Sequence, residues 1–112
     1  MSAQQHLDVI AQRQERARPK ASRLIRQRII EAALHWQSFY PHHVNLTGVD
    51  PWSLNCVGSA FRVLLKYGVI EQTGRHRRSR KEASGSRRVF EYRLRSERKA
   101  LEILNENRTT NT

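Results

Sequence analysis

The stretch from Trp52 to Leu94 constrains the fold most strongly, because an amphipathic helix there leads directly into a basic hairpin. Four apolar residues recur at the spacing of one helical face: Val57, Phe61, Leu64 and Leu65. The opposite face is polar and carries Asn55, Ser59, Arg62 and Lys66. Glycine tolerates positive φ just beyond a helix, so Gly68 marks its end. The pattern predicts a helix that begins near Ser53 or Asn55 and ends at Tyr67.

The residues after Gly68 predict two strands and a loop. Val69–Thr73 begins the first strand, and residues 74–86 form a polar, arginine-rich loop bounded by glycines. The returning strand, Val89–Leu94, alternates in polarity. Its one face carries Phe90, Tyr92 and Leu94.

Two further helices are expected around this stretch. Ser22 can cap a helix that extends to about Phe39 and ends before Pro41. Its core face contains Ile25, Ile29, Ala32, Ala33, Trp36 and Tyr40. Ser96 caps a final helix over residues 96–106, and the tail 107–112 is expected to fray. The apolar stripe of that helix is Ala100, Leu101 and Leu104.

The remaining segments have weaker patterns. Residues 1–21 predict a basic N-terminal arm, either helical or ordered only by a partner, because their apolar stripe is thin. Val44–Leu46 suggests a short strand, and Gly48 and Pro51 mark turns. We expect Trp36 and Trp52 to anchor the core rather than to stack on nucleobases.

Length and charge limit the classes of function. The 112 residues suffice for one small domain, here placed at residues 22–95. The net charge is +11, and its excess lies in two blocks. Residues 1–30 carry seven basic and two acidic residues, and residues 71–95 carry nine and three, whereas residues 31–70 are neutral. Such concentrated positive charge is typical of a phosphate-binding surface.

Other classes receive little support. No apolar run approaches the roughly 20 residues that span a bilayer, and the polar start does not resemble a secretory signal. A single cysteine, Cys56, excludes an internal disulfide and fits a reducing, cytoplasmic location. His42, His43 and Cys56 match no common zinc spacing, and the carboxylates suggest no nuclease site. We therefore expect no catalytic residue, metal or cofactor.

The order of these elements, with the segment Phe61–Ile70, resembles a winged-helix DNA-binding domain. Members of that family end the recognition helix with an apolar pattern such as Leu64-Leu-Lys-Tyr-Gly-Val-Ile, and then build a two-stranded wing. The segment Thr73–Leu94 is similar to the arginine-rich wings of small bacteriophage and mobile-element proteins. The resemblance covers residues 22–95 and implies an α+β fold with a three-helix core and a basic β-wing. The Gly and Pro between Val44 and Ser53 make the helix before the recognition helix very short or displaced.

This resemblance implies roles for individual side chains. In a helix-turn-helix arrangement the recognition helix reads base edges in the major groove, which gives that role to Asn55, Ser59 and Arg62. Asn55 can equally cap its helix. Gly58 allows close approach of another backbone, for which tight packing within the chain is the simpler interpretation. Contacts to the DNA backbone or minor groove are expected from Lys66, Arg75, Arg77, Arg78, Arg80, Lys81, Arg87 and Arg88. Phosphate contacts from the arm are expected from Arg16, Arg18, Lys20 and Arg23, with Arg26 extending them.

The expected function is therefore non-catalytic binding of double-stranded DNA, in transcription regulation or DNA architecture in a bacterium or phage. A homodimer is expected to use the final helix, through Leu101 and Leu104, or the arm, through Leu7 and Ile10. Two alternatives remain open. One is a protein-interaction module that acts on a host nucleic-acid machine, and the other is a binder of structured RNA.

Overall fold

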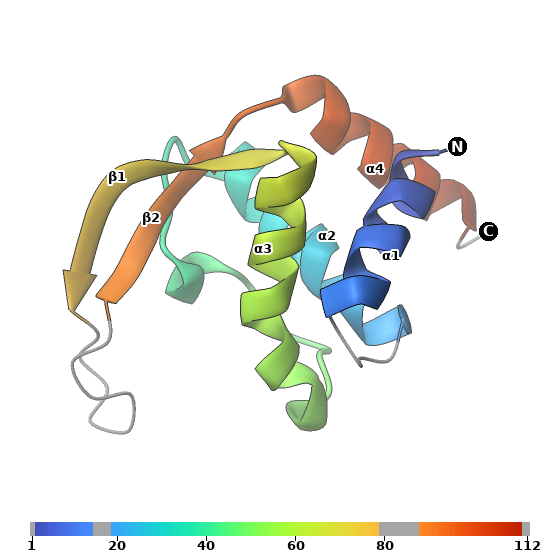
Figure 1. Cartoon of the computed structure of the whole chain (residues 1–112), viewed down its shortest axis with the longest axis horizontal. Coiled ribbons are helices and arrows are strands. Elements are labelled where there is room, and N and C mark those ends of the chain that lie inside the picture. Colours follow the sequence, from blue (N-terminus) through green and yellow to red (C-terminus); the bar gives the residue numbers. More distant parts are fainter. Residues whose placement is uncertain (1, 15–18, 79–87, 111–112) are drawn as a thin grey trace.

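Helix α3 (Val57–Tyr67) lies at the centre of the molecule, between α1 (Ala3–Gln14) and the hairpin (Figure 1). The structure is a computed structural model that describes residues 2–14, 19–78 and 88–110. The other elements are α2 (Pro19–His35), the 3-10 helices η1 (Pro41–His43) and η2 (Pro51–Cys56), strands β1 (Ile70–Arg78) and β2 (Arg88–Leu94), and α4 (Glu97–Thr110). The described residues thus form an α+β fold with four α-helices and an antiparallel hairpin after α3, as the sequence predicts at this level.

The core lies between α2, α3 and the base of the hairpin. The side chains of α3 that are buried are Ala60, Phe61, Val63 and Leu64, so the predicted apolar face is confirmed at Phe61 and Leu64. Opposite them, Ile25, Ile29 and Ile30 of α2 are fully buried. An aromatic cluster joins the hairpin to this core. The centroid of the Phe61 ring lies 4.6 Å from that of Tyr92 and 6.2 Å from that of Phe39.

Helix α2 begins and ends earlier than predicted. It starts at Pro19, a residue preorganised for the first helical position, so Ser22 is a buried interior residue and not the cap. It ends at His35. Farther on, Pro41 disfavours helix in the residue before it. Tyr40 is extended, with φ −104° and ψ 162°. Phe39 is extended too, and its N–H and C=O both pair with Tyr92 of β2 at 2.8 Å.

This early end moves Trp36 out of the core. Its side chain is 45% exposed, so the prediction that it anchors the core is wrong. Phe39, which is fully buried, takes that place. The side chain of Trp52, the other predicted anchor, lies outside what the structure describes.

The connection between α2 and α3 also differs from the prediction. No strand forms at Val44–Leu46; the turn η1 precedes it, and Val44 packs in the core. Residues 51–56 form η2, which continues directly into α3. The first predicted turn of α3 is therefore 3-10 rather than α-helical.

The end of α3 is confirmed at Tyr67. Gly68 has φ +88°, which an L side chain rarely adopts. Its N–H lies 3.0 Å from the carbonyl oxygen of Leu64 and 3.2 Å from that of Leu65. This left-handed residue turns the chain from α3 into β1.

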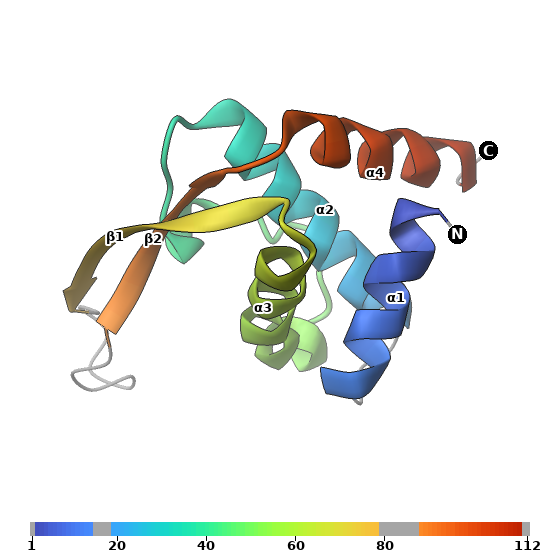
Figure 2. The same cartoon turned by 45° about the horizontal axis from the view of Figure 1, so that its top comes forward.

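The hairpin is longer than predicted and is curved. Strand β1 continues to Arg78, through residues that the sequence assigns to the loop. Two extra residues on β1 shift the register between Gln72 and His76, and Gly74 lies there with φ +92°. Such a bulge bends a strand. In both views the outer end of the hairpin turns toward the side on which α3 begins (Figures 1 and 2).

The N-terminal segment expected as an arm contains a helix docked on the domain. Ala3 and Leu7 of α1 are buried, and the Ala3 N–H donates to the Glu106 carboxylate of α4 at 3.1 Å. In α4, Ile103 is fully buried, whereas Leu101, which the sequence places on the apolar stripe, is 45% exposed. Of the expected dimer contacts, Leu7 is thus used within the chain, while Leu101 faces outward. None of the described helices has the length and apolar character needed to cross a membrane.

Candidate nucleic-acid interface

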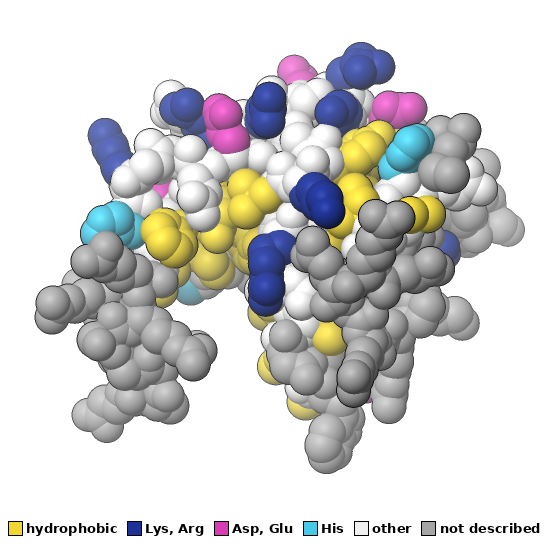
Figure 3. All heavy atoms as spheres, viewed as in Figure 1, with side chains coloured by type: hydrophobic (Ala, Val, Ile, Leu, Met, Phe, Trp, Pro, Cys, Tyr) yellow, Lys and Arg dark blue, Asp and Glu magenta, His cyan; other side chains and the backbone are white. Residues whose placement is uncertain are grey.

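The outward face of α3 is polar and basic. Arg62 and Lys66 are exposed and Ser59 is half-buried, as the helical spacing predicts. Figure 3 shows Lys and Arg side chains over α3, beside a band of hydrophobic side chains. Within the described parts of the chain, neither Arg62 nor Lys66 forms an ion pair. Both charges are therefore available to a phosphate or a base edge.

Gly58 lies at the start of this face and is exposed. Among the described residues outside the helix backbone, the nearest atom to a Cβ built at this position is Arg62 Nη2, at 3.9 Å. The simpler interpretation, that Gly58 packs tightly within the chain, is therefore wrong. The helix surface here is open to another molecule. Asn55, the third predicted base reader, lies in η2 just before α3.

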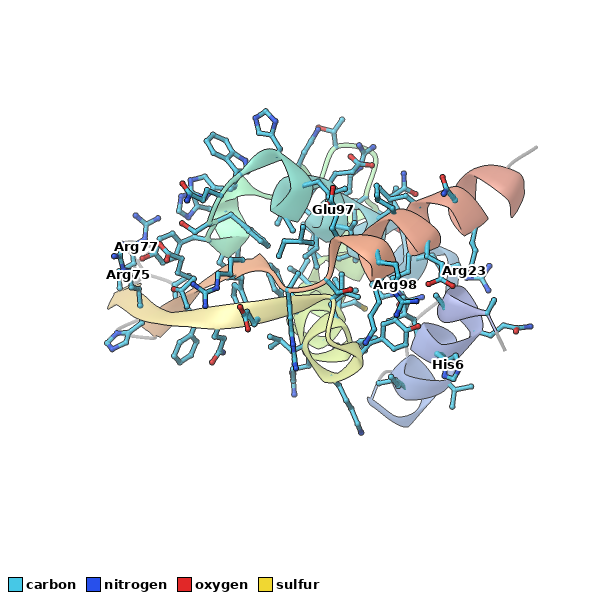
Figure 4. All side chains as sticks on the ribbon, turned by 90° about the horizontal axis from the view of Figure 1, so that it is seen from above. His6, Arg23, Arg75, Arg77, Glu97 and Arg98 are labelled. Atoms are coloured by element: carbon cyan, nitrogen blue, oxygen red, sulfur yellow. The ribbon has the colours of Figure 1, made fainter. Side chains whose placement is uncertain are left out.

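The hairpin places its predicted contacts at the outer end. Arg75 and Arg77 are exposed and lie beside each other there (Figure 4). Arg78 and Arg88 are paired across the last described rung of the hairpin. Three further residues predicted to contact the DNA backbone or minor groove lie outside the described residues: Arg80, Lys81 and Arg87.

Arg77 also joins the hairpin to the segment after α2. Its guanidinium carbon lies 4.4 Å from the centre of the Tyr40 ring. Its Nη2 is 2.8 Å from Nδ1 and 2.9 Å from Nε2 of His42. A neutral imidazole has one acceptor nitrogen, so one of the two accepts the hydrogen bond. We call Tyr40, His42 and Arg77 the hairpin clamp.

The opposite face of the hairpin carries His76 and Phe90. They are directly opposed across the strands, with ring centroids 6.2 Å apart, so they share a face. This is the face that carries Tyr92 nearer the core, because residues two apart in a strand point the same way. Phe90 is 40% exposed, although its alternation with Tyr92 predicts burial.

A buried carboxylate stabilises the bend of the hairpin. Glu91 is 9% exposed, and its Oε1 accepts a hydrogen bond of 2.7 Å from the Thr73 hydroxyl. The same hydroxyl oxygen accepts the Arg75 N–H at 3.2 Å. Thr73 therefore links the bulge of β1 to β2.

The predicted arm contacts are dispersed. Arg16 and Arg18 lie outside the described residues, and Lys20 lies in the first turn of α2. Arg23 is exposed at the end of the molecule opposite Arg75 and Arg77 (Figure 4). Arg26 is 1% exposed, so it does not extend the surface as expected.

Two tyrosines near the interface have raised pKa values. Burial raises the pKa of the Tyr92 phenol above its ordinary value of 10.0, and a hydrogen bond with Gln72 opposes that shift. Burial also raises the pKa of Tyr67, with smaller contributions from Glu102 and Glu106. Both side chains are thus neutral near pH 7. Among the described residues, no group of three or more His, Cys, Asp or Glu is placed to hold a metal.

Sequence reasoning missed the hairpin clamp and the exposure of Trp36. Pro41, which favours extended backbone at Tyr40, was a signal for the clamp. The apolar periodicity continues through Trp36 and Tyr40, so it predicts both residues in the core and places the end of the helix near Phe39, whereas α2 ends at His35.

Comparisons with known proteins do not identify the chain. No protein-family model matches it, and neither the curated proteins nor the solved structures include a significant match.

Proposed function

We propose that this chain is a non-catalytic, winged-helix-type protein that binds double-stranded DNA, with α3 in the major groove and the hairpin as the wing. The order of elements supports the proposal. Helix α2, α3 and the β1–β2 hairpin follow one another in the order expected for that family, while only the short 3-10 helices η1 and η2 lie where its second helix is expected. The role that fits best is transcription regulation or DNA architecture.

The observation that carries the proposal is the outward face of α3. Arg62 and Lys66 are exposed there without acidic partners among the described residues, and Gly58 is exposed beside them. An α-helix fits the major groove, where an arginine can donate two hydrogen bonds to guanine. Lys66, one turn farther along, suits a phosphate contact.

The curvature of the hairpin supports a second contact with the duplex, made by the hairpin itself. The bulge at Gly74 bends the strands toward the side on which α3 begins (Figure 2). A duplex lying against α3 would therefore also meet the outer end of the hairpin. The last rung there carries Arg78 and Arg88, and the segment beyond it adds Arg80, Lys81 and Arg87. Backbone contacts of this kind add affinity without base preference.

The test is a titration of a labelled random duplex at two salt concentrations. We expect binding that weakens steeply with salt, because each phosphate contact releases counterions. A matched titration with double-stranded RNA separates the two nucleic acids, since A-form RNA has a narrow major groove that side chains cannot read. The proposal fails if the duplex does not bind, or if RNA binds more tightly than DNA.

A further inference from the structure

Trp36 lies at the surface just beyond the end of α2, where nothing in the described structure covers it. Its indole is 45% exposed. It stacks on His43 at 5.2 Å between ring centroids with an interplanar angle of 29°, and His35 meets it edge-on at 5.0 Å. The indole is therefore held in place by two rings while part of it faces solvent.

A hollow of about 380 Å³ lies beside this indole. Its lining includes Arg28 and Glu31 of α2 together with Trp36, His43 and Asn45. We call it the tryptophan groove. Its volume falls in the range of small-ligand sites, about 300–1,000 Å³. The groove combines an aromatic surface with an exposed side-chain amide and a guanidinium.

A row of rings leads from this groove to the hairpin. His43 and His42 have centroids 4.1 Å apart, and His42 stacks on Tyr40 at 5.9 Å with an interplanar angle of 12°. The row ends at Arg77, whose guanidinium lies over the Tyr40 ring. The inner rings of this row pack on one another and under Arg77, so they fix Trp36 and Arg77 relative to each other rather than offering further open ring faces.

The charges along this surface suit an anionic strand. The one carboxylate in the groove, Glu31, is offset by Arg28 at 3.5 Å and accepts a hydrogen bond from Gln27 at 3.0 Å. The Arg28 Nη2 also donates to the Thr47 carbonyl oxygen at 3.3 Å, which fixes its position. The far end carries Arg75 and Arg77. The groove is therefore not acidic, and the charge becomes positive toward the hairpin.

We propose that the tryptophan groove binds an unpaired base of single-stranded nucleic acid against Trp36, and that the hairpin arginines hold the phosphates of the same strand. Bases stack on exposed aromatic side chains in sites of this kind, while cationic groups follow the phosphates. The base faces in a duplex are already stacked on one another, so the exposed indole selects unpaired strands. The Asn45 amide can pair with the edge of a base held against Trp36.

The tryptophan groove lies away from the α3 surface proposed for duplex DNA. Figure 4 shows η1 and the end of α2 on one side of the hairpin and α3 on the other. The two surfaces share only the hairpin arginines Arg75 and Arg77, while Trp36 belongs to the groove alone and Arg62 to α3 alone. The two proposals can therefore fail independently.

The test uses the fluorescence of Trp36. The chain has two tryptophans, so Trp52→Phe leaves Trp36 as the only reporter. We expect a thymidine oligomer of about 16 nucleotides, near the largest site of a small single-strand-binding fold, to quench this fluorescence to saturation. A uridine oligomer in a parallel arm shows whether the sugar matters.

Variants in the natural chain complete the test. Trp36→Ala should weaken oligomer binding about tenfold, since stacking of one base has about that effect, and Trp36→Phe should retain most of it. Leu34→Ala is the matched control, because Leu34 is an exposed apolar residue of α2 outside the groove. Duplex binding should be unchanged in all three. If Trp52→Phe does not fold, anisotropy of a labelled oligomer with these variants decides.

The inference is overturned if Trp36→Ala binds the oligomer as tightly as the natural chain does. It is equally overturned if Arg62→Ala weakens oligomer binding as much as Trp36→Ala does, because the strand would then lie on the α3 surface. Loss of duplex binding with intact oligomer quenching would instead reject the proposed function and leave this inference standing.

Discussion

Gly58 is a position at which stability and binding should change in opposite directions. It lies in the first turn of α3, exposed, with room for a methyl group. Glycine within a helix costs about 0.5–1 kcal/mol relative to alanine, so Gly58→Ala should raise the melting temperature. The added methyl would stand in the proposed interface and lower duplex affinity. Thermal denaturation and duplex anisotropy measure the two effects, and an unchanged affinity would argue against DNA at this surface.

Gly68 provides the contrasting substitution. Its φ of +88° is unfavourable for an L side chain, and an added Cβ would also meet Lys99 Nζ at 3.3 Å. The lysine end can move, so the backbone strain dominates. Gly68→Ala should therefore destabilise the fold by about 1–2 kcal/mol, as measured by chemical denaturation. Duplex affinity below the melting temperature should not change, because Gly68 lies at the far end of α3.

Tyr92 predicts a loss of stability in alkaline solution. Burial raises its pKa above 10.0, the value it regains on unfolding. The folded state therefore holds the proton more tightly than the unfolded state. The contribution of Tyr92 to the free energy of unfolding is complete below pH 10 and is lost as the pH rises through the pKa of the folded state. Tyr92→Phe should lower this dependence of stability on pH in melting curves taken from pH 9 to pH 11.

Single residues were predictable where local chemistry determines them. The end of α3 at Gly68 and the burial of Phe61 and Leu64 follow from glycine conformation and helical spacing. The exposure of Trp36 does not, because it depends on where α2 ends and on Phe39 occupying the core. That competition between two aromatic residues is decided by tertiary packing.

The hairpin clamp should set the rigidity of the outer hairpin. Arg77 contacts Tyr40 and His42, whereas the neighbouring Arg75 side chain makes no such contact in the part of the chain described. A cation–π contact at an exposed site contributes about 0.5–1 kcal/mol. Arg77→Ala should therefore speed amide exchange of outer hairpin residues such as Val89 by about two- to fivefold.

Arg75→Ala is the matched control for the clamp, since it removes the same charge from the same strand. It should leave the exchange rates near those of the natural chain. Equal acceleration in both variants would mean that net charge, and not the clamp, determines the mobility of the hairpin.

The elements themselves were predictable to different degrees. The helix–glycine–hairpin order was evident because each boundary has its own residue signal. The length of β1 was not, since its outer half is polar and Gly74 looks like the start of a loop. In the structure that glycine lies in a bulge, and β1 continues beyond it to Arg78. A polar strand outside the core has no periodic apolar face to mark it.

The distribution of charge over the molecule assigns different tasks to its parts. Residues 31–70, which include α3, are neutral overall, whereas residues 71–95 hold more than half of the net charge of +11. In the proposed DNA complex, electrostatic attraction to phosphates should therefore come mainly from the hairpin and the N-terminal block. Preference among sequences should come from the few exposed side chains of α3. The sequence indicated this division, and the structure adds the open surface at Gly58 and the separate tryptophan groove.

The most direct test of the account is selection of binding sites from random duplex DNA with three proteins: the natural chain, Arg62→Ala and Arg98→Ala. Arg98 is an exposed arginine that belongs to α4 and not to α3, so its removal controls for the loss of one positive charge (Figure 4). The natural chain and Arg98→Ala should enrich the same short site. Arg62→Ala should relax the preference at one position or more, by about 1–3 kcal/mol. Enrichment of the same site with undiminished preference by Arg62→Ala would contradict the assignment of α3 as the helix that reads DNA.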